Sequence, residues 1–585
     1  VDTIPVGRTA VISQSGSVIG TILSRGHAAG QAYAAFVSTG NEAQMGVGDI
    51  GLALVDDPAI DAFIVFLETL RGRETFAAFA ASADAAGKPI VAYSVGRTCA
   101  GQALAQSHTG AMTGGAQALH AWLRAHDVRE VASLDALIEA PSALRAFGSS
   151  GLRRRSEPTS ARGKPERGVV VITTTGGGGA MMVDTLAADD VPLCALSDET
   201  RRALAALGVH SGAGPLVDVT LAGATYETMR AVVDCLIRAD EVALVMAVIG
   251  SSAQFHPELA VRPLIDAAHA ASEESAALTA PVMAFALPHA PESLALLAGA
   301  GVPAFRTVES AAETVALALR ASVGRTGASA DARRSGPSAR TTEAVAALLN
   351  NLPEGLCTEA QGARVFAALG IPMVPHRVVR VDESDDAAAA LWQDDHHAAW
   401  TRDFGTTVPV WPVAAKLLSR DIAHKSDVGA VRLSIDSAQG LRHAIVDMEQ
   451  ATRAAQPDAV IDGALVQPMV RGLGNAIIGF TRDPAVGPVV TVGAGGVMAE
   501  IYRDIAVGIA PITPGRAMEL IDQIAGFALL RGYRNHTMGD LEGVAQAVAA
   551  LSELAHHPRV VEAEINPLFV QDAAVVGVDA VLRLS

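Results

Sequence analysis

Two stretches of the chain join an all-apolar run to a turn made of hydroxyl residues and glycines. The first reads TAVISQSGSVIG over residues 9–20, and the second reads GVVVITTTGGGGAMM over residues 168–182. Each stretch predicts a buried strand, a tight turn and the first residues of a helix. Strands that are apolar on both faces are typical of parallel sheets covered by helices on both sides. The chain is therefore expected to contain doubly wound α/β domains.

The segments that follow the two turns also correspond to each other in order. Each pair combines elements of the same type, either two apolar strands or two strands that each lead into an amphipathic helix. The pairs are residues 59–69 with 239–250, residues 87–96 with 279–288, and residues 127–140 with 301–319. We infer two similar domains in tandem, the second a structural repeat of the first.

Two stretches rich in Gly, Ser, Pro and Arg have no apolar period and are expected to be linkers. They cover residues 148–168 and 323–342. The predicted domains are residues 1–147, residues 169–322 and residues 343–585. In the third domain, helical segments are combined with several strands of antiparallel type, which indicates an α+β fold.

Charge and cysteine content restrict the class of partner. The 585 residues carry a formal net charge of -18, which argues against nucleic acid and anionic membrane surfaces because both require a basic footprint. The 4 cysteines lie far apart without a CxxC pair or zinc-type spacing, and we expect reduced thiols of a cytoplasmic protein. No apolar run is long enough for a membrane span, and the first residues lead into a strand rather than forming a signal peptide.

Both turns are expected to place backbone N–H groups at a helix start, where the helix dipole favours an anion such as phosphate. The residues concerned are Ser15 and Gly16 in the first turn and Gly176, Gly177 and Gly178 in the second. The alternative is that the glycines only allow tight packing, and neither turn is a GxxxxGK[ST] loop. Because the turns occur in duplicated domains, our hypothesis is a shared phosphate site.

One histidine, His108, stands among small residues in the stretch ALAQSHTGAMTGG, residues 103–115. A neutral imidazole is a good nucleophile and can carry a phosphoryl group between two helix starts. It needs a carboxylate to fix its tautomer. Glu68 ends an apolar parallel strand, where open α/β sheets place active groups. The alternative for His108 is a loop histidine hydrogen-bonded to backbone.

These motifs resemble the α-type domains of NDP-forming acyl-CoA synthetases, the relatives of succinyl-CoA synthetase and of ADP-forming acetate–CoA ligase. The matching segments are SQSGS, STGNEA, the SHTGA stretch and TTTGGGGAMMVD. The third domain is similar to the β-type ATP-grasp domain of that family through AAKLLSRDIAHKSDVGAVRL, TRDPAVGPVVTVGAGGV and AEINPLFV. The resemblance covers nearly the whole chain. It implies two tandem flavodoxin-like α/β domains followed by an ATP-grasp α+β domain.

The resemblance also implies a reaction, the ATP-dependent joining of a carboxylic acid to CoA with release of ADP and phosphate. The intermediates are a phosphohistidine and an acyl phosphate. His108 would be the phosphorylated residue, Glu68 its supporting carboxylate and His424 a second phosphate carrier near the nucleotide. The implied cofactors and substrates are ATP or ADP, Mg²⁺, CoA and a small carboxylic acid. We expect a homo-oligomer.

Five residues of the third domain are candidates for nucleotide and metal binding. Lys416 follows an apolar run from which its ammonium group can reach nucleotide phosphates, and the alternative is an edge lysine that reaches solvent. The stretch VQPM contains Gln467 and Met469 and resembles the hinge whose backbone reads adenine. Asn566 and Asp579 offer oxygen ligands of the type that Mg²⁺ takes. The resemblance assigns Mg²⁺ to the same pair.

The chain departs from the family pattern in several places. Nothing before Gly7 can hold the CoA-binding Rossmann domain with which single-chain members begin, so either the chain is a piece of a longer protein or another polypeptide helps to bind CoA. Pro468 and Asn475 stand where glutamates are usual, and Ser94 stands where a lysine is common. A catalytically impaired or regulatory nucleotide-binding relative is therefore the alternative function. TTTGGGGAMMVD and GSSAQFHPELAVRP look more like the hydroxycinnamoyl (feruloyl-type) branch than the acetate branch.

Overall fold

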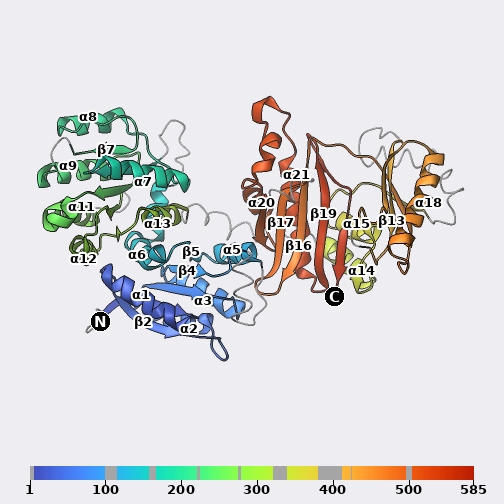
Figure 1. Cartoon of the computed structure of the whole chain (residues 1–585), viewed down its shortest axis with the longest axis horizontal. Coiled ribbons are helices and arrows are strands. Elements are labelled where there is room, and N and C mark those ends of the chain that lie inside the picture. Colours follow the sequence, from blue (N-terminus) through green and yellow to red (C-terminus); the bar gives the residue numbers. More distant parts are fainter. Residues whose placement is uncertain are drawn as a thin grey trace. The chain divides into compact units, whose positions relative to one another are not determined.

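The chain forms two compact units, residues 1–329 and 330–585. The computed structural model in Figure 1 describes residues 6–98, 115–156, 167–220, 224–273, 279–320, 339–379, 411–422, 425–495 and 504–585. The first unit holds the predicted tandem domains, and the second unit holds the predicted α+β domain.

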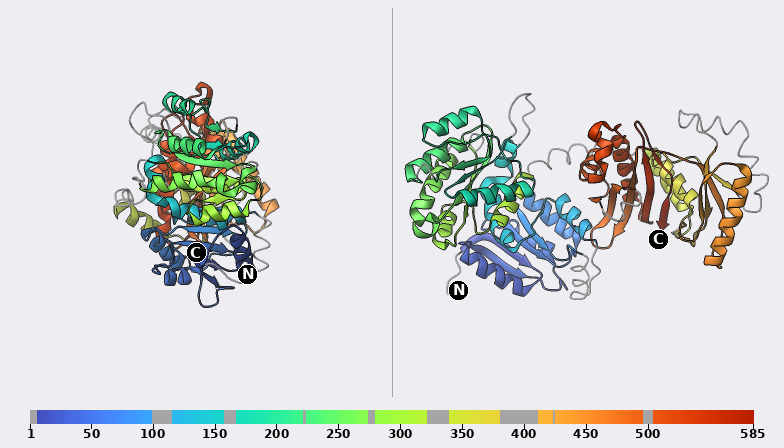
Figure 2. Two further views of the ribbon diagram at one scale, coloured as in Figure 1. Left: turned by 90° about the vertical axis from the view of Figure 1, so that its left-hand side faces the viewer. Right: turned by 45° about the horizontal axis from the view of Figure 1, so that its top comes forward.

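A parallel sheet with the strand order β2-β1-β3-β4-β5 opens the first unit. Its strands are β1 (Val6–Ser13), β2 (Tyr33–Ser38), β3 (Ala62–Leu67), β4 (Ile90–Ser94) and β5 (Arg129–Glu130). Its helices are α1 (Gly16–Ala28), α2 (Val47–Leu54), α3 (Arg73–Ala85), α5 (Ala116–Ala125) and α6 (Leu134–Ser156). Val11, Ile12 and Ile64 in the central strands have 0% exposed surface, because helices cover both faces of the sheet (Figure 2).

The second domain of this unit repeats the topology of the first. Its sheet, read from one edge, has the order β7-β6-β8-β9-β10. The strands are β6 (Gly168–Thr173), β7 (Leu216–Asp218), β8 (Val242–Ile249), β9 (Val282–Ala286) and β10 (Ala304–Phe305). The helices are α7 (Gly176–Ala188), α8 (Asp198–Ala206), α9 (Tyr226–Ile237), α10 (Ser252–Phe255), α11 (Pro257–Glu273), α12 (Pro291–Gly299) and α13 (Val308–Arg320). Each strand therefore has a counterpart in the first sheet, as the paired apolar segments predict.

Helix α6 of the first domain packs against α13 of the second, and a buried ionic network accompanies this contact. Arg306 donates from Nε to Glu139 Oε1 at 2.8 Å and from Nη2 to Asp135 Oδ1 at 2.7 Å. Arg25 at the end of α1 also donates to Asp135 Oδ1, at 2.7 Å. The Glu139 side chain is 0% exposed. Burial raises the pKa of Glu139, against the opposing effects of its bonds from Ser310 and Arg306.

The second unit contains two antiparallel sheets. The larger has the order β11-β21-β19-β16-β17-β18, with β20 paired to β19, and the smaller has the order β12-β15-β13-β14. The strands are β11 (Gly355–Leu356), β12 (Arg377–Val379), β13 (Val413–Leu418), β14 (Val431–Ile435), β15 (Gly463–Pro468), β16 (Gly474–Asp483), β17 (Gly487–Ala494), β18 (Ile505–Ile509), β19 (Val560–Val570), β20 (Val575–Gly577) and β21 (Val581–Leu584). The helices are α14 (Ala339–Asn350), α15 (Glu359–Ala368), α18 (Ala438–Ala455), α20 (Pro514–Ile521) and α21 (Leu541–Ser552), with short 3-10 turns at Ala525–Arg531, Tyr533–Asn535 and Glu553–His556.

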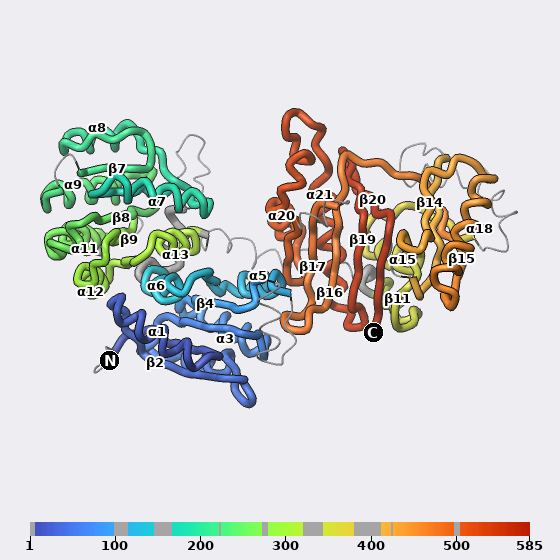
Figure 3. Tube along the Cα trace, in the orientation of Figure 1, coloured from blue at the N-terminus to red at the C-terminus, as the bar shows by residue number. Residues whose placement is uncertain are grey.

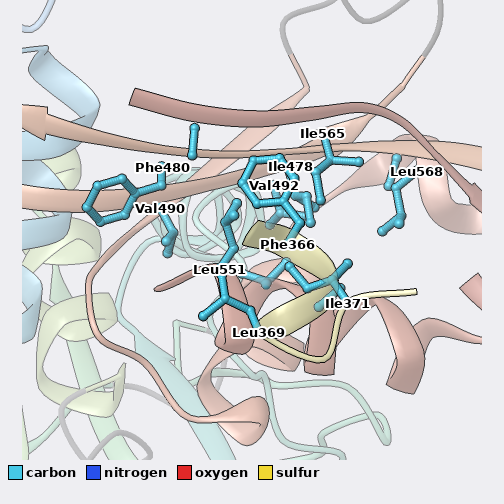
Figure 4. Packing of buried hydrophobic residues seen from close by; sticks show 14 of the residues in the cluster. Phe366, Leu369, Ile371, Ile478, Phe480, Val490, Val492, Leu551, Ile565 and Leu568 are labelled. Carbon is cyan, nitrogen blue, oxygen red and sulfur yellow. The ribbon is translucent and has the colours of Figure 1, made fainter. Parts of the chain in front are cut away.

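The core of the second unit lies on one face of the larger sheet. Figure 4 shows Phe366 of α15 and Leu551 of α21 packed with Ile478, Val492 and Ile565 from neighbouring strands. The smaller sheet has its own core, in which α18 packs on β13 and β14 (Figure 3). The unit therefore has two sheets, each with its own core and its own helices.

The predicted fold class is confirmed, with two parallel five-stranded α/β sheets followed by antiparallel ATP-grasp-type sheets. Helix α6 continues to Ser156, into the segment predicted as the first linker, and α14 begins at Ala339 inside the second. Of the helices formed by described residues, none has the length and apolar character needed to cross a membrane.

Replacing Arg306 with alanine is expected to lower the free energy of unfolding by about 3 kcal/mol, because Glu139 then keeps a buried charge with fewer partners. Loss of the guanidinium raises the pKa of Glu139 in the folded state further above that in the unfolded state. The folded state then binds more protons between the two pKa values, so the deficit should grow as pH rises from about 5 to 8. Urea unfolding of the wild type and the variant at about pH 5 and about pH 8, the two ends of this range, measures the difference in the free energy of unfolding.

Arg262→Ala is the matched control, since Arg262 is 61% exposed and pairs only with Asp266 on the same helix among the ion pairs of the described residues. Its effect should stay within about 0.5 kcal/mol. A loss from Arg306→Ala no larger than the control's, or one that shrinks with rising pH, would contradict the prediction.

Candidate functional site

Four charged side chains form a group in the second unit, which we call the lysine–carboxylate cluster: Glu359 and Lys416, which are buried, and Lys425 and Asp579, which are partly exposed. Lys416 Nζ lies 2.7 Å from Glu359 Oε1, and Lys425 Nζ lies 2.8 Å from Glu359 Oε2. Asp579 Oδ1 lies 3.5 Å from Lys416 Nζ and 3.7 Å from Lys425 Nζ. Each lysine therefore faces both carboxylates, and the four formal charges sum to zero.

Separate elements position these side chains. Glu359 is the first residue of α15, where Thr358 and Gln361 form a capping box that fixes the helix start. Lys416 lies within β13, a strand whose six residues are all buried, and it is itself 6% exposed. This burial excludes the edge lysine that the sequence allowed as an alternative.

A backbone carbonyl next to the cluster joins the two sheets. Val578 O, between β20 and β21, accepts hydrogen bonds from Lys416 Nζ at 2.7 Å and from Gln467 Nε2 at 2.9 Å. Gln467, on β15 of the smaller sheet, is 4% exposed. The predicted hinge residue Met469 follows β15, and its N–H donates to Pro412 O at 3.2 Å. Lys416 and Gln467 thus meet at one place, while the amide of Met469 is engaged within the smaller sheet.

The cluster holds its charges by mutual neutralisation. Burial raises the pKa of Asp579, but Lys416 and Lys425 outweigh that effect and hold the pKa below its usual value. Burial lowers the pKa of Lys425, but Glu359 and Asp579 outweigh it, so the pKa lies above its usual value. Burial also raises the pKa of Glu359, against the attraction of Lys416. Lys425 therefore keeps its positive charge, and Lys416 lies beside it on the other oxygen of the same carboxylate.

Asn566 lies in β19, and Asp579 lies at the matching position of the adjacent segment between β20 and β21. On one side of them Leu568 pairs with Gly577, and on the other side Glu564 pairs with Val581, in the same register. The two side chains offer one amide oxygen and one carboxylate, a donor set that fits Mg²⁺ because this ion keeps several waters and takes few protein ligands. Within the described residues, three or more His, Cys, Asp or Glu do not gather into a metal-type group.

Sequence reasoning missed Glu359 and gave no role to Lys425. One signal was available, because the whole chain has only four lysines, at positions 88, 164, 416 and 425, among 44 Lys and Arg residues. Two of these four lysines lie in the lysine–carboxylate cluster. In a chain whose basic residues are mostly arginine, a lysine indicates a site that favours a compact ammonium group over a guanidinium.

In the first unit, the two predicted turns share one hydrogen-bond pattern. Ser13 Oγ accepts from Ser15 N–H at 3.0 Å and donates to Ser15 O at 2.8 Å. Thr173 Oγ1 does the same with Thr175, at 3.0 and 2.7 Å. In both domains the last hydroxyl of the strand therefore fixes the turn that starts the helix.

Gln14 connects the first turn to Glu68. Its side-chain oxygen accepts from Glu68 N–H at 2.5 Å and from Thr69 N–H at 3.0 Å. Its amide nitrogen donates to Thr69 O at 2.8 Å. In this parallel sheet the chain adds β2 on one side of β1 and β3 to β5 on the other. Ligands of such sheets bind at the carboxyl ends of the strands where the order changes side, here between β1 and β3. Gln14 thus holds the turn of Ser15 and Gly16 beside Glu68 at the expected binding edge.

The two glycine turns differ in the charge beside them. A Cβ built on Gly16 would lie 3.7 Å from the hydroxyl of Ser38, whereas one built on Gly176 would lie 3.1 Å from Asp218 Oδ2. A carboxylate at a helix N-terminus already complements the positive end of the dipole. The start of α1 therefore suits an added phosphate better than the turn of Gly176, Gly177 and Gly178.

The predicted phosphate carriers His108 and His424 lie outside the described residues. Among the departures from the family pattern, Ser94 ends β4, Pro468 ends β15, and Asn475 lies in β16. Asn475 O accepts from Gly495 N–H at 2.8 Å. The structure therefore brings together Lys416, Gln467 and Asp579 in one unit, and Ser15, Gly16 and Glu68 in the other.

Comparisons with known proteins cover both units. Residues 350–584 match the family described as ATP-grasp domain, and residues 6–144 match the succinyl-CoA ligase like flavodoxin domain. The chain is 28% identical over 579 residues to ADP-forming acetate–CoA ligase I of Archaeoglobus fulgidus, covering 98% of this chain and 77% of that protein. It is 35% identical over 223 residues to the β subunit of ADP-forming acetate–CoA ligase I of Pyrococcus furiosus, covering 38% of this chain and 89% of that subunit. It is 26% identical over 589 aligned residues to a trans-feruloyl-CoA synthase of an unknown prokaryotic organism, covering 99% of this chain and 77% of that protein.

A double-mutant cycle on Glu359 and Lys416 is expected to show strong coupling within the cluster. Glu359→Gln or Lys416→Met alone should lower the free energy of unfolding of the second unit by about 3 kcal/mol, because each leaves buried charge uncompensated. The double variant should recover at least about 1 kcal/mol relative to the sum of the two. Urea titrations that follow the transition of this unit measure the cycle.

The control cycle uses Glu449 and Arg453, a pair one helical turn apart on α18 in which Arg453 is 64% exposed. Its coupling should stay below about 0.5 kcal/mol. Additive losses at Glu359 and Lys416 would show that the two charges do not depend on each other.

Proposed function

Since the chain belongs to the family of NDP-forming acyl-CoA synthetases, relatives of ADP-forming acid–CoA ligases over nearly its whole length, we propose that it joins a carboxylic acid to CoA using ATP. ADP and phosphate are the other products. The observation that carries this proposal is the lysine–carboxylate cluster, because its two ammonium groups and its Asp579 are the groups that a magnesium nucleotide needs.

At the nucleotide end, Lys416 and Lys425 bind the phosphates, and Gln467 lines the same place through its bond to Val578 O. Asn566 and Asp579 hold Mg²⁺, which when bound neutralises phosphate charge and orients the terminal phosphoryl group. With the ion bound, Asp579 would contact it in place of the lysines, while Glu359 would stay on the lysines because its side chain is only 2% exposed.

At the acyl end, the start of α1 holds the phosphoryl group through the N–H groups around Ser15 and Gly16. His108 carries the phosphoryl group with Glu68 as its supporting carboxylate, and His424 carries it near the nucleotide. The glycine turn of α7 takes a secondary part, because the Asp218 carboxylate lies beside Gly176 at the start of that helix. The acid attacks the phosphohistidine, and the thiol of CoA then displaces phosphate from the acyl phosphate.

The carboxylic acid substrate has two candidate classes. The relatives act by name on acetate or form trans-feruloyl-CoA, and the segments TTTGGGGAMMVD and GSSAQFHPELAVRP favour the hydroxycinnamoyl type. Acetate and ferulate therefore represent the two substrate classes to be compared.

With ATP, Mg²⁺, CoA and either acetate or ferulate, the protein is expected to form the matching thioester together with equal amounts of ADP and phosphate. Labelled ATP with Mg²⁺ should leave acid-labile, base-stable phosphate on the protein, because a phosphohistidine precedes acyl transfer. His108→Ala should lose this label or move it to His424, and the exposed control His27→Ala should keep it on the wild-type residue. Formation of AMP and pyrophosphate, or thioester formation by His108→Ala at the wild-type rate, would contradict the mechanism.

Replacing Lys416 with methionine is expected to raise the Kd for ATP with Mg²⁺ at least about tenfold, because a charge-assisted bond to phosphate is lost. Lys416→Arg should not restore tight binding, since the guanidinium is larger than the buried site of an ammonium group. Lys88→Met is the control, because Lys88 donates to the carbonyls of Val55 and Asp57 in the other unit. Calorimetric titration measures all three, and an unchanged Kd in Lys416→Met would refute the assignment.

A further inference from the structure

A second histidine of the first domain is held by a carboxylate. Glu130 in β5 accepts a hydrogen bond from the hydroxyl of Ser94 on one oxygen and contacts His120 Nδ1 with the other. We call these residues the Ser94–Glu130–His120 cluster. Ser94 is 1% exposed, and the side chains of Glu130 and His120 are 16% and 31% exposed. The cluster therefore places a hydrogen-bonded, partly buried carboxylate behind an imidazole that solvent or a ligand can reach.

This cluster lies next to the binding edge of the first sheet. Ser94 is the last residue of β4 and pairs with Leu67 of β3, the residue before Glu68. Val95 N–H donates to Leu67 O at 2.9 Å, so the ends of β3 and β4 are joined. Figure 1 shows α5, which carries His120, near β4 and β5. Neighbouring strands are about 4.8 Å apart, which puts the cluster within a few strand spacings of Glu68 and of the turn at Ser15.

The carboxylate determines what the imidazole can do. When Nδ1–H donates to Glu130, Nε2 is left as the acceptor, and the carboxylate stabilises the imidazolium formed when Nε2 takes a proton. Ser94 holds the second oxygen of Glu130 in place. This arrangement is that of a general base with a fixed tautomer.

The proposed reaction has one step that requires such a base. The carboxylic acid is already an anion near neutral pH, and a neutral imidazole attacks phosphorus with a lone pair, so neither nucleophile must lose a proton. The CoA thiol is mostly protonated, because a free thiol has a pKa of about 8.5. Thioester formation is therefore the step that removes a proton from its nucleophile.

Resting on the proposed function, we infer that His120 is the general base for attack by the CoA thiol and that Glu130 is its positioning residue. The S–H bond breaks and its proton moves to His120 Nε2, while the sulfur electron pair forms the C–S bond to the acyl carbon. The C–O bond of the acyl phosphate breaks, and phosphate leaves with that electron pair. The imidazolium then returns its proton to phosphate or water.

The test separates the half-reactions of the full chain with labelled ATP, with acetate and ferulate as acids. His120→Gln should form the phosphoenzyme, and pass its label to the acid, at the wild-type rate. Thioester formation should fall about a hundredfold, as for loss of a general base. Glu130→Gln should show the same selective loss. Added imidazole should restore thioester formation in His120→Gly, which a merely structural role would not predict.

His27→Gln is the matched control, because His27 is an exposed histidine at the last turn of α1 in the same domain. It should leave every step unchanged. Thioester formation within threefold of wild type in His120→Gln overturns the inference, and so does an equal loss of all steps without imidazole rescue. A wild-type chain that forms phosphoenzyme but no thioester instead overturns the proposed function itself, and with it the role of His120.

Discussion

The second unit depends on neutralising a charge that it buries at the start of α15. Glu359 is 3% exposed, and a carboxylate so placed requires partners of opposite charge. The partners are Lys416 in β13 and Lys425. Asp579, which follows β20 of the larger sheet, supplies the second negative charge. The shared acceptor Val578 O ties the same place to β15. These contacts thus join the two sheets at the proposed nucleotide site.

The first unit shows how a duplicated fold can divide its tasks. Both domains keep the strand order, and in both a hydroxyl two residues before the helix N-cap, that of Ser13 or Thr173, fixes the turn. The residue at the end of the neighbouring strand differs, a hydroxyl in Ser38 and a carboxylate in Asp218. The shared scaffold therefore retains the backbone geometry for an anion in both places, while electrostatics favours the anion in only one of them.

The sequence predicted the parts of this structure that depend on local pattern. Buried parallel strands appear in the sequence as apolar runs, and the turns after them appear as clusters of hydroxyl residues and glycines. The repeated topology could therefore be predicted from the sequence. Glu359 and Gln14 were not, because their partners are far along the chain: Glu359 binds Lys416 57 residues away, and Gln14 binds Thr69 55 residues away. Nothing local distinguishes such a Glu or Gln from a surface residue. The roles of His108 and His424 stay predictions, since both lie outside the described residues.

At the proposed nucleotide site, lysine suits the need to exchange partners. The formal charges of the cluster sum to zero without a ligand, and a bound nucleotide would take the same cations. A guanidinium forms rigid, bidentate pairs with carboxylates, whereas an ammonium group is compact and can turn toward a new acceptor. In the proposed exchange, Glu359 would keep its contacts with Lys416 and Lys425, and Asp579, which lies 3.5 and 3.7 Å from them, would be the partner that gives way. A chain that uses arginine almost everywhere else thus keeps two of its four lysines where charge must be both buried and exchangeable.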